Sequence, residues 1–191
     1  MKTMNRMMLC LAWLGVALAA PATAQMSPAT VRIASTERVP HAAAEPAPSA
    51  DLRLDRSLDR IRKVTAPYLD LIDAVVDGWT QRYPLDCAVT PEGAWAYHFM
   101  NPALMDDQVE LLRPELLMYE PQEDGSLELV GVKYVIPFEA WTDTGAPTLL
   151  GERFTRNAAL GAWALDVWAW RTNPLGLFAV RNPDVSCAHA W

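Results

Sequence analysis

The spacing of the apolar residues changes once along this chain, and that change limits the fold more than any other feature. Over residues 51–82 large apolar residues recur at steps of three and four, which is the period of one helix face. The residues of this stripe are Leu54, Leu58, Ile61, Thr65, Tyr68, Ile72, Val75 or Val76, and Trp79. From Cys87 onward the apolar runs are short and bounded by proline, asparagine or glycine, as strands are. A helical region followed by strands predicts the α+β class.

Pro67 interrupts the helical stripe, because a proline inside a helix removes a hydrogen bond and clashes with the preceding turn. Two alternatives are open. Either an amphipathic helix at the N-terminal end of the domain is kinked near Pro67, or Thr65 caps a second helix that starts there. Gly78 and Pro84 mark the end of the helical region.

Five segments are predicted to be strands: residues 94–100, 115–120, 127–136, 163–171 and 177–181. The second and third are joined by the polar turn QEDGS, which indicates a β-hairpin. Residues 138–162 are predicted to be irregular. We therefore expect the helix to pack on an antiparallel sheet of four or five strands.

Three Asn-Pro pairs follow predicted strands, at Asn101, Asn173 and Asn182. Proline cannot donate to a sheet ladder, and asparagine can close a turn through its own side chain. The pairs are therefore predicted to end strands and redirect the chain. The alternative is that one of these amides points into a site.

The first 24 residues have the pattern of a transport signal. Lys2 and Arg6 precede an uncharged apolar run over residues 7–20, and Ala22-Thr23-Ala24 is a small-residue cleavage pattern. The run is short for a retained membrane helix, which is the weaker alternative. We expect residues 1–24 to be a signal peptide, residues 25–50 a disordered Ala/Pro-rich tail, and residues 51–191 a single domain exported to the periplasm or outside the cell.

Two cysteines follow the predicted cleavage site, Cys87 and Cys187. An even number of cysteines in an exported chain predicts a disulfide bond. The alternative is a redox pair, but these residues lack the C-x-x-C spacing of redox cysteines.

Charge excludes one class of partner. After removal of Lys2 and Arg6 with the leader, the chain carries 14 basic and 23 acidic residues, a net charge of −9. Such a chain repels phosphate backbones, so we expect no nucleic-acid binding. No second apolar stretch is long enough to cross a membrane, so we expect no membrane association once the leader is removed.

Two residues are candidates for catalysis or metal binding, His98 and Asp166. His98 lies in a predicted strand with Ala96 and Met100 on its face. Asp166 lies in WALDVWAWR, where alternation puts Trp168 and Trp170 beside it. A carboxylate and an imidazole in contact would form an acid/base pair or hold a shared ion. The ordinary alternatives are a structural histidine and a solvated acid.

The candidate ligand-binding residues are Tyr97, His98, Asn101, Asp166, Trp168 and Trp170. Aromatic faces beside a carboxylate suit a planar, sugar-like or cationic small molecule. Glu115 and Glu120 flank one predicted strand on opposite faces, so they cannot form a carboxylate pair, and Glu120 is predicted to be a turn residue. No nucleotide-loop, nucleophile-elbow or H-E-x-x-H motif is present, so no cofactor is identified.

Several segments together resemble a family of exported bacterial proteins that has no assigned activity. They are YHFMNPALM at 97, RPELLMYEP at 113, LVGVKYVIP at 129, LDVWAWRTNPLGLFA at 165 and NPDVSC at 182. The resemblance covers roughly residues 68–187 and implies no mechanism. The family pattern commonly has histidine at the position of Asp166, so a site built on two histidines is in question here.

Two functions are therefore expected. The first is an exported small-ligand-binding or accessory protein with an aromatic-lined cleft. The second is a metal-dependent or acid/base hydrolase-like enzyme that uses His98 and Asp166.

Overall fold

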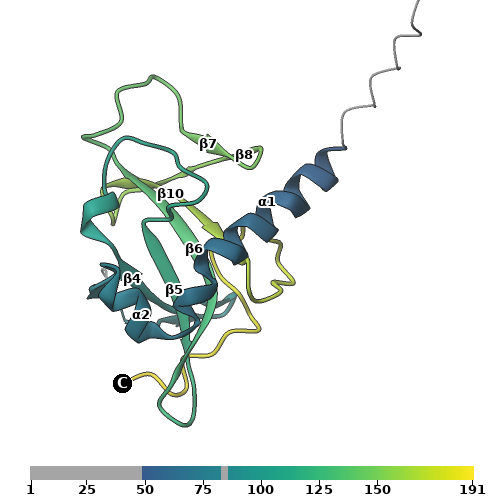
Figure 1. The fold of residues 1–191 in the computed structure, drawn as a ribbon, viewed down its shortest axis with the longest axis vertical. Coiled ribbons are helices and arrows are strands. Elements are labelled where there is room, and N and C mark those ends of the chain that lie inside the picture. Colours follow the sequence, from purple (N-terminus) through teal and green to yellow (C-terminus); the bar gives the residue numbers. More distant parts are fainter. Residues whose placement is uncertain (1–48, 83–85) are drawn as a thin grey trace, which may run out of the picture. The chain divides into compact units, whose positions relative to one another are not determined.

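The computed structural model describes residues 49–82 and 86–191, and Figure 1 shows how their elements are arranged. The predicted signal peptide and most of the predicted tail lie outside the described residues. The helices are α1 (Ala50–Thr65), the 3-10 turn η1 (Ala66–Leu69), α2 (Leu71–Val76) and the 3-10 turn η2 (Pro102–Leu104). The strands are β1 (Gln81–Arg82), β2 (Val89–Thr90), β3 (Gly93–Ala94), β4 (Tyr97–Met100), β5 (Leu116–Pro121), β6 (Leu127–Pro137), β7 (Thr148–Leu149), β8 (Glu152–Arg153), β9 (Thr155–Asn157) and β10 (Ala162–Val167).

Six of these strands form one antiparallel sheet in the order β1-β4-β5-β6-β10-β9. The α+β class and the β5–β6 hairpin are confirmed, but the sheet has six strands where the sequence predicted four or five. The predicted strand at 177–181 is wrong, because no strand forms there. The two additional strands, β1 and β9, are two and three residues long and pair at the sheet edges. Strands this short carry too few alternating residues to be recognised from periodicity.

The helical region is kinked at Pro67, where the 3-10 turn η1 separates α1 from α2. α1 begins at Ala50, so it is the first described element and not the N-terminus of the protein. The Ser49 hydroxyl caps α1 by accepting a hydrogen bond from the Leu52 N–H. Thr65 makes no capping bond, and Asp70 caps α2 by accepting the Ile72 N–H at 2.8 Å. Gly78, at φ +110°, ends α2 as predicted, and a Cβ there would lie 2.8 Å from the Asn101 amide nitrogen.

The sheet has an apolar layer on each face. On the first face, Leu58 and Ile61 of α1 share a buried cluster with Leu117, Val132 and other sheet residues. The second face carries two smaller clusters. One contains Ala94, Ala96, Met118, Val130, Trp168 and Val185, and the other contains Met100, Leu116, Val135, Ala162 and Ala164. Alternation in β4 is confirmed, since Met100 lies on the second face and Tyr97 and Phe99 on the first. The predicted strand at 94–100 is interrupted before β4, because Ala96 has a φ of 64°.

A bulge in β6 ends β10. The register of β5 and β6 shifts between Met118 and Tyr119, which leaves Val130 as the extra residue. The Val130 carbonyl accepts hydrogen bonds from the N–H groups of Trp170 and Arg171, at 3.1 and 3.0 Å. The chain therefore leaves its extended path after Val167, and the predicted strand at 163–171 is four residues shorter at its end than expected.

The three Asn-Pro asparagines make the same pair of hydrogen bonds. Each Oδ1 accepts the backbone N–H two residues later, those of Ala103, Leu175 and Asp184. Each Nδ2 donates to a distant carbonyl, those of Asp77, Arg181 and Thr172. Asn173 and Asn182 thus each bind the segment beside the other. The predicted turns are confirmed at all three pairs, but the predicted strand ends are wrong at Asn173 and Asn182, since only Asn101 directly follows a strand.

Replacing Asn182 with alanine is expected to lower the free energy of unfolding by about 2 to 4 kcal/mol, because two backbone groups lose their partners at a buried position. Asn182 is completely buried. Urea unfolding measures the loss. Asn157→Ala is the control, because Asn157 makes one hydrogen bond, to the Leu160 N–H, and is only half-buried. A loss for Asn182→Ala no larger than that of the control would contradict the proposed role.

The predicted disulfide is present between Cys87 and Cys187, with Cα atoms 5.5 Å apart. It joins the start of the strand region to the C-terminal segment across a sequence separation of 100 residues. For a loop of this length the chain-entropy model gives about 4 to 5 kcal/mol of stabilisation. Among the described residues, no helix has the length and apolar character needed to cross a membrane.

Candidate functional site

Three ionisable side chains lie together on the second face of the sheet. His98 comes from β4, Lys133 from β6 and Asp166 from β10, and all three are at most 7% exposed. Lys133 and Asp166 are direct cross-strand partners, with Nζ 2.9 Å from Oδ1. The same Nζ lies 3.5 Å from Nε2 of His98. These three residues are termed the Lys133 cluster.

Burial determines the charge states in the Lys133 cluster. Burial, and secondly the charge of Lys133, lowers the pKa of His98 well below its ordinary value. The imidazole is therefore neutral at neutral pH and can accept a hydrogen bond from the ammonium group through Nε2. Burial raises the pKa of Asp166, and the contact with Lys133 opposes that shift. The arrangement is a buried ion pair beside a neutral imidazole.

The Lys133 cluster brings both catalytic candidates, His98 and Asp166, into contact with one residue that sequence reasoning missed. The only signal for Lys133 was a lysine inside the apolar run LVGVKYVIP. Its ammonium group occupies the space between the two side chains where the metal hypothesis requires an ion. Within residues 49–82 and 86–191, no group of three His, Cys, Asp or Glu side chains is placed to hold a metal ion.

Trp168 and Trp170 do not share a face, in contrast to the prediction. Trp168 lies in the second-face cluster and donates its indole N–H to the Ala179 carbonyl at 2.6 Å. Trp170 donates to the Thr65 hydroxyl of α1 at 3.0 Å, on the first face. Alternation fails here because β10 ends at Val167. Both residues line a cavity of about 300 Å³ together with Arg62, Ala169, Arg171, Thr172, Asn173 and Leu177.

The side chain of Tyr97 belongs neither to the Lys133 cluster nor to the cavity lined by Trp168 and Trp170. Its hydroxyl accepts the Trp191 N–H at 2.7 Å and donates to the Trp191 carbonyl at 2.8 Å. The Arg82 guanidinium lies 4.2 Å from the centre of its ring. The Tyr97 hydroxyl is therefore occupied by the backbone of Trp191.

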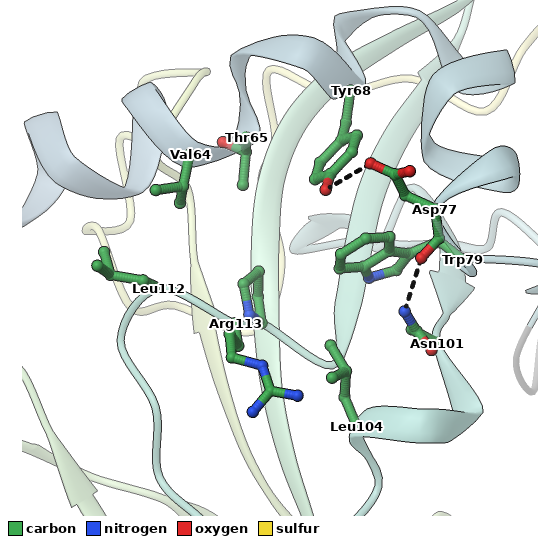
Figure 2. A pocket seen from close by; sticks show the side chains of 10 residues that line it. Val64, Thr65, Tyr68, Asp77, Trp79, Asn101, Leu104, Leu112 and Arg113 are labelled. Atoms are coloured by element: carbon green, nitrogen blue, oxygen red, sulfur yellow. Dashed lines mark hydrogen bonds between the residues drawn. The ribbon is translucent and has the colours of Figure 1, made fainter.

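Asn101, the remaining predicted ligand residue, lines a cavity of about 310 Å³ between the helices and the segment before β5. Figure 2 shows Tyr68, Asp77 and Trp79 on one side of this space and Val64 and Leu112 on the other. The full lining is Val64, Thr65, Tyr68, Asp77, Trp79, Asn101, Leu104, Leu112, Arg113 and Pro114. This space is termed the Tyr68–Trp79 cavity.

Two buried tyrosines of the sheet hold the walls of the Tyr68–Trp79 cavity. The Tyr119 hydroxyl donates to the Tyr68 carbonyl at 2.7 Å, which fixes η1. The Tyr134 hydroxyl donates to the Leu111 carbonyl at 2.7 Å, which fixes the segment before β5. Both tyrosines are at most 1% exposed. The cavity is therefore built on the sheet and does not depend on loop contacts alone.

The polar groups of the cavity are mostly paired. Tyr68 donates to an Asp77 carboxylate oxygen at 3.2 Å, and the Asn101 amide donates to the Asp77 carbonyl at 3.2 Å (Figure 2). Burial, with the hydrogen bond to Asp77, raises the pKa of Tyr68. Arg113 pairs with Glu110.

Trp79 is the exception, because its buried indole N–H has no hydrogen-bond partner among residues 49–82 and 86–191. The Tyr68 and Trp79 rings are 4.7 Å apart and tilted, and the indole nitrogen lies on the edge of the ring that faces Leu104 and Asn101 (Figure 2). An unpaired buried donor costs about 1 to 3 kcal/mol. Sequence reasoning placed Tyr68 and Trp79 in the apolar stripe, and their spacing contains no signal that separates a cavity lining from a core.

Comparison of the chain with protein-family models, with curated proteins and with solved structures found no match.

Proposed function

We propose that this chain is an exported protein that binds a small molecule in the Tyr68–Trp79 cavity. The observation that carries the proposal is the N–H of Trp79, which no described residue accepts, since an acceptor on a ligand would satisfy this donor. The support from Tyr119 and Tyr134 favours a preformed site, and a preformed site loses less entropy when a ligand binds.

The lining indicates the chemistry of the ligand. A volume of about 310 Å³ is at the lower end of the range for ligand pockets, which favours a single ring system. Two aromatic side chains favour a planar ring, and the Trp79 N–H favours a carbonyl or other acceptor on that ring. Benzamide has both features and is a suitable probe.

Titration of the protein with benzamide is expected to shift the indole N–H resonance of Trp79 in a ¹H–¹⁵N spectrum. Trp79→Phe keeps an aromatic ring and removes the donor, so it is expected to weaken binding by about tenfold, as the loss of one hydrogen bond implies. Because the variant has no Trp79 indole, the affinities of the wild type and of Trp79→Phe are both measured from backbone resonances that shift on titration.

Trp191→Phe is the matched control, because Trp191 is 66% exposed and does not line the cavity. It is expected to leave the affinity unchanged. A benzamide titration that moves the Trp168 and Trp170 indoles and not Trp79 would assign binding to the other cavity. No indole shift at all would contradict the proposal for planar ligands.

Export is the second part of the proposal. The Cys87–Cys187 disulfide supports it, since stable disulfides form in oxidising compartments. The mature protein secreted by its own leader is expected to begin at Gln25 and to contain no free thiol, which intact mass measurement and thiol labelling test. A protein that keeps residues 1–24 and stays in the cytoplasm would contradict the proposal of export.

The hydrolase-like alternative that uses His98 and Asp166 has weaker support. Both side chains are buried and already contact Lys133. Elemental analysis of the mature protein beside His98→Ala is its test, and a stoichiometric metal lost in the variant would favour it.

A further inference from the structure

The outer surface of α2 and the end of η1 is apolar, and no described residue covers it. Leu69, Ile72, Val75 and Val76 are 40% to 78% exposed, and they account for four large apolar side chains within eight residues. The inner surface of the same helix is also apolar, with Ala74 completely buried. A helix that is apolar on both sides is normally covered on both sides. These four exposed residues are termed the α2 patch.

A groove continues the α2 patch toward the β5–β6 turn. Leu69 belongs to both, and the groove has a volume of about 580 Å³. Its lining is Leu69, Gln122, Glu123, Asp124, Ser126, Leu127, Glu128 and Leu129. Three leucines thus lie among three acidic residues. The groove and the α2 patch form one surface with apolar side chains and acidic surroundings.

The charged residues that line this surface are all acidic. Asp70 and Asp73 lie beside and in α2, and no lysine or arginine occurs between Lys63 and Gln81. Of the acidic groove residues, Glu128 is paired with Arg171. A second copy of this chain would bring the same acids to the interface, and an anionic membrane would be repelled.

We infer that the α2 patch and the adjoining groove bind a basic amphipathic helix of another protein. Apolar side chains of that helix, spaced three and four residues apart, would cover Ile72, Val76 and Leu69. Its lysines or arginines would lie beside the aspartates of α2 and the acids of the groove. Helix-in-groove binding of this kind uses an apolar face for affinity and charge for orientation. This surface is separate from the Tyr68–Trp79 cavity, so the inference does not depend on the proposed ligand.

The test uses a labelled synthetic peptide of leucine and lysine with helical periodicity, titrated with the folded protein and followed by fluorescence anisotropy. The variant Ile72→Gln/Val76→Gln removes the apolar contacts and keeps good helix formers. It is expected to weaken binding at least about tenfold, as expected for the loss of two buried aliphatic side chains. Asp73→Asn/Glu123→Gln is expected to weaken binding several-fold and to reduce its dependence on salt.

Val89→Gln/Val180→Gln is the matched control, because both valines are exposed outside this surface. It is expected to bind the peptide as the wild type does. Equal affinity of the wild type and the α2 variant would overturn the inference, as would equal binding of a leucine–glutamate peptide. Self-association of the wild type that the α2 variant abolishes would also overturn it, in favour of a second copy as the occupant. Thermal unfolding of each variant verifies that the fold is retained.

Discussion

Replacing Lys133 with methionine is expected to lower the free energy of unfolding at neutral pH by about 3 to 5 kcal/mol, because Asp166 then stays buried without its cation. The two side chains are 4% and 3% exposed and 2.9 Å apart, so water cannot replace the missing partner. The cost should be smaller at acid pH, where Asp166 is protonated. Denaturant unfolding at several pH values measures it.

The double variant Lys133→Met/Asp166→Asn is the control for lost packing, since it removes both charges and keeps similar volumes. It is expected to be more stable than Lys133→Met alone, because no unpaired charge is left. A double variant as unstable as the sum of the single variants would contradict the ion-pair account.

The resonances of His98 give an independent readout of the same change. Burial and the charge of Lys133 both lower the pKa of His98. In Lys133→Met this pKa is expected to rise while staying below its ordinary value, because burial still acts. An unchanged titration of His98 would show that Lys133 does not influence it.

Glu115 is expected to make the protein less stable as the pH rises from about 4.5 to about 8. Burial raises the pKa of Glu115 from 4.5 to about 8, and the charges of Asp106 and Glu110 add to the shift. The folded state therefore holds a proton that the unfolded chain releases, so stability falls through this window and is constant above it. A shift of this size corresponds to about 5 kcal/mol at its full extent.

The variant Glu115→Gln isolates this contribution. Its side-chain carbonyl can still accept the Val135 N–H, which Glu115 accepts at 2.9 Å, but it has no proton to lose. Below pH 4.5 the variant and the wild type are expected to be similarly stable, and above pH 8 the variant is expected to be more stable. Asp107→Asn, an exposed change in the preceding segment, should give no such pH-dependent difference. Parallel pH profiles of the wild type and Glu115→Gln would contradict the prediction.

The class of the fold could be predicted because its signals are local. The stripe from Leu54 to Trp79 has a helical period, and the QEDGS turn between two apolar runs is the signature of a hairpin. Where the prediction was wrong, a distant contact prevailed over the local signal. Trp170 lies on the first face because the Val130 carbonyl binds the chain after Val167, and no pattern near Trp170 reports that contact. Glu120, predicted as a turn residue, is buried and accepts the Ser186 N–H at 2.7 Å.

The predicted site residues lie in different groups from those that the sequence suggested. His98 and Asp166 do lie on one face, which alternation within each strand allowed. Their common contact with Lys133 depends on the order β4-β5-β6-β10 and on the register between strands. Alternation reports the face of a side chain and says nothing of its neighbour on the next strand. The Tyr68–Trp79 cavity was missed for a related reason, since residues lining a space and residues filling one have the same spacing.

The sequence by itself determined the helix and its interruption at Pro67, the hairpin, the α+β class and the disulfide between Cys87 and Cys187. The helix, the hairpin and the class follow from the spacing of apolar residues and from the turn residues, which depend only on neighbours along the chain. The disulfide follows from the even number of cysteines. The tertiary structure alone decided that Lys133 joins His98 to Asp166. It also decided that, within the described part of the chain, the Trp79 N–H has no acceptor and the α2 patch is exposed. Each of these depends on which distant groups meet after the sheet has formed, and burial then sets their charge states and their free hydrogen-bonding capacity.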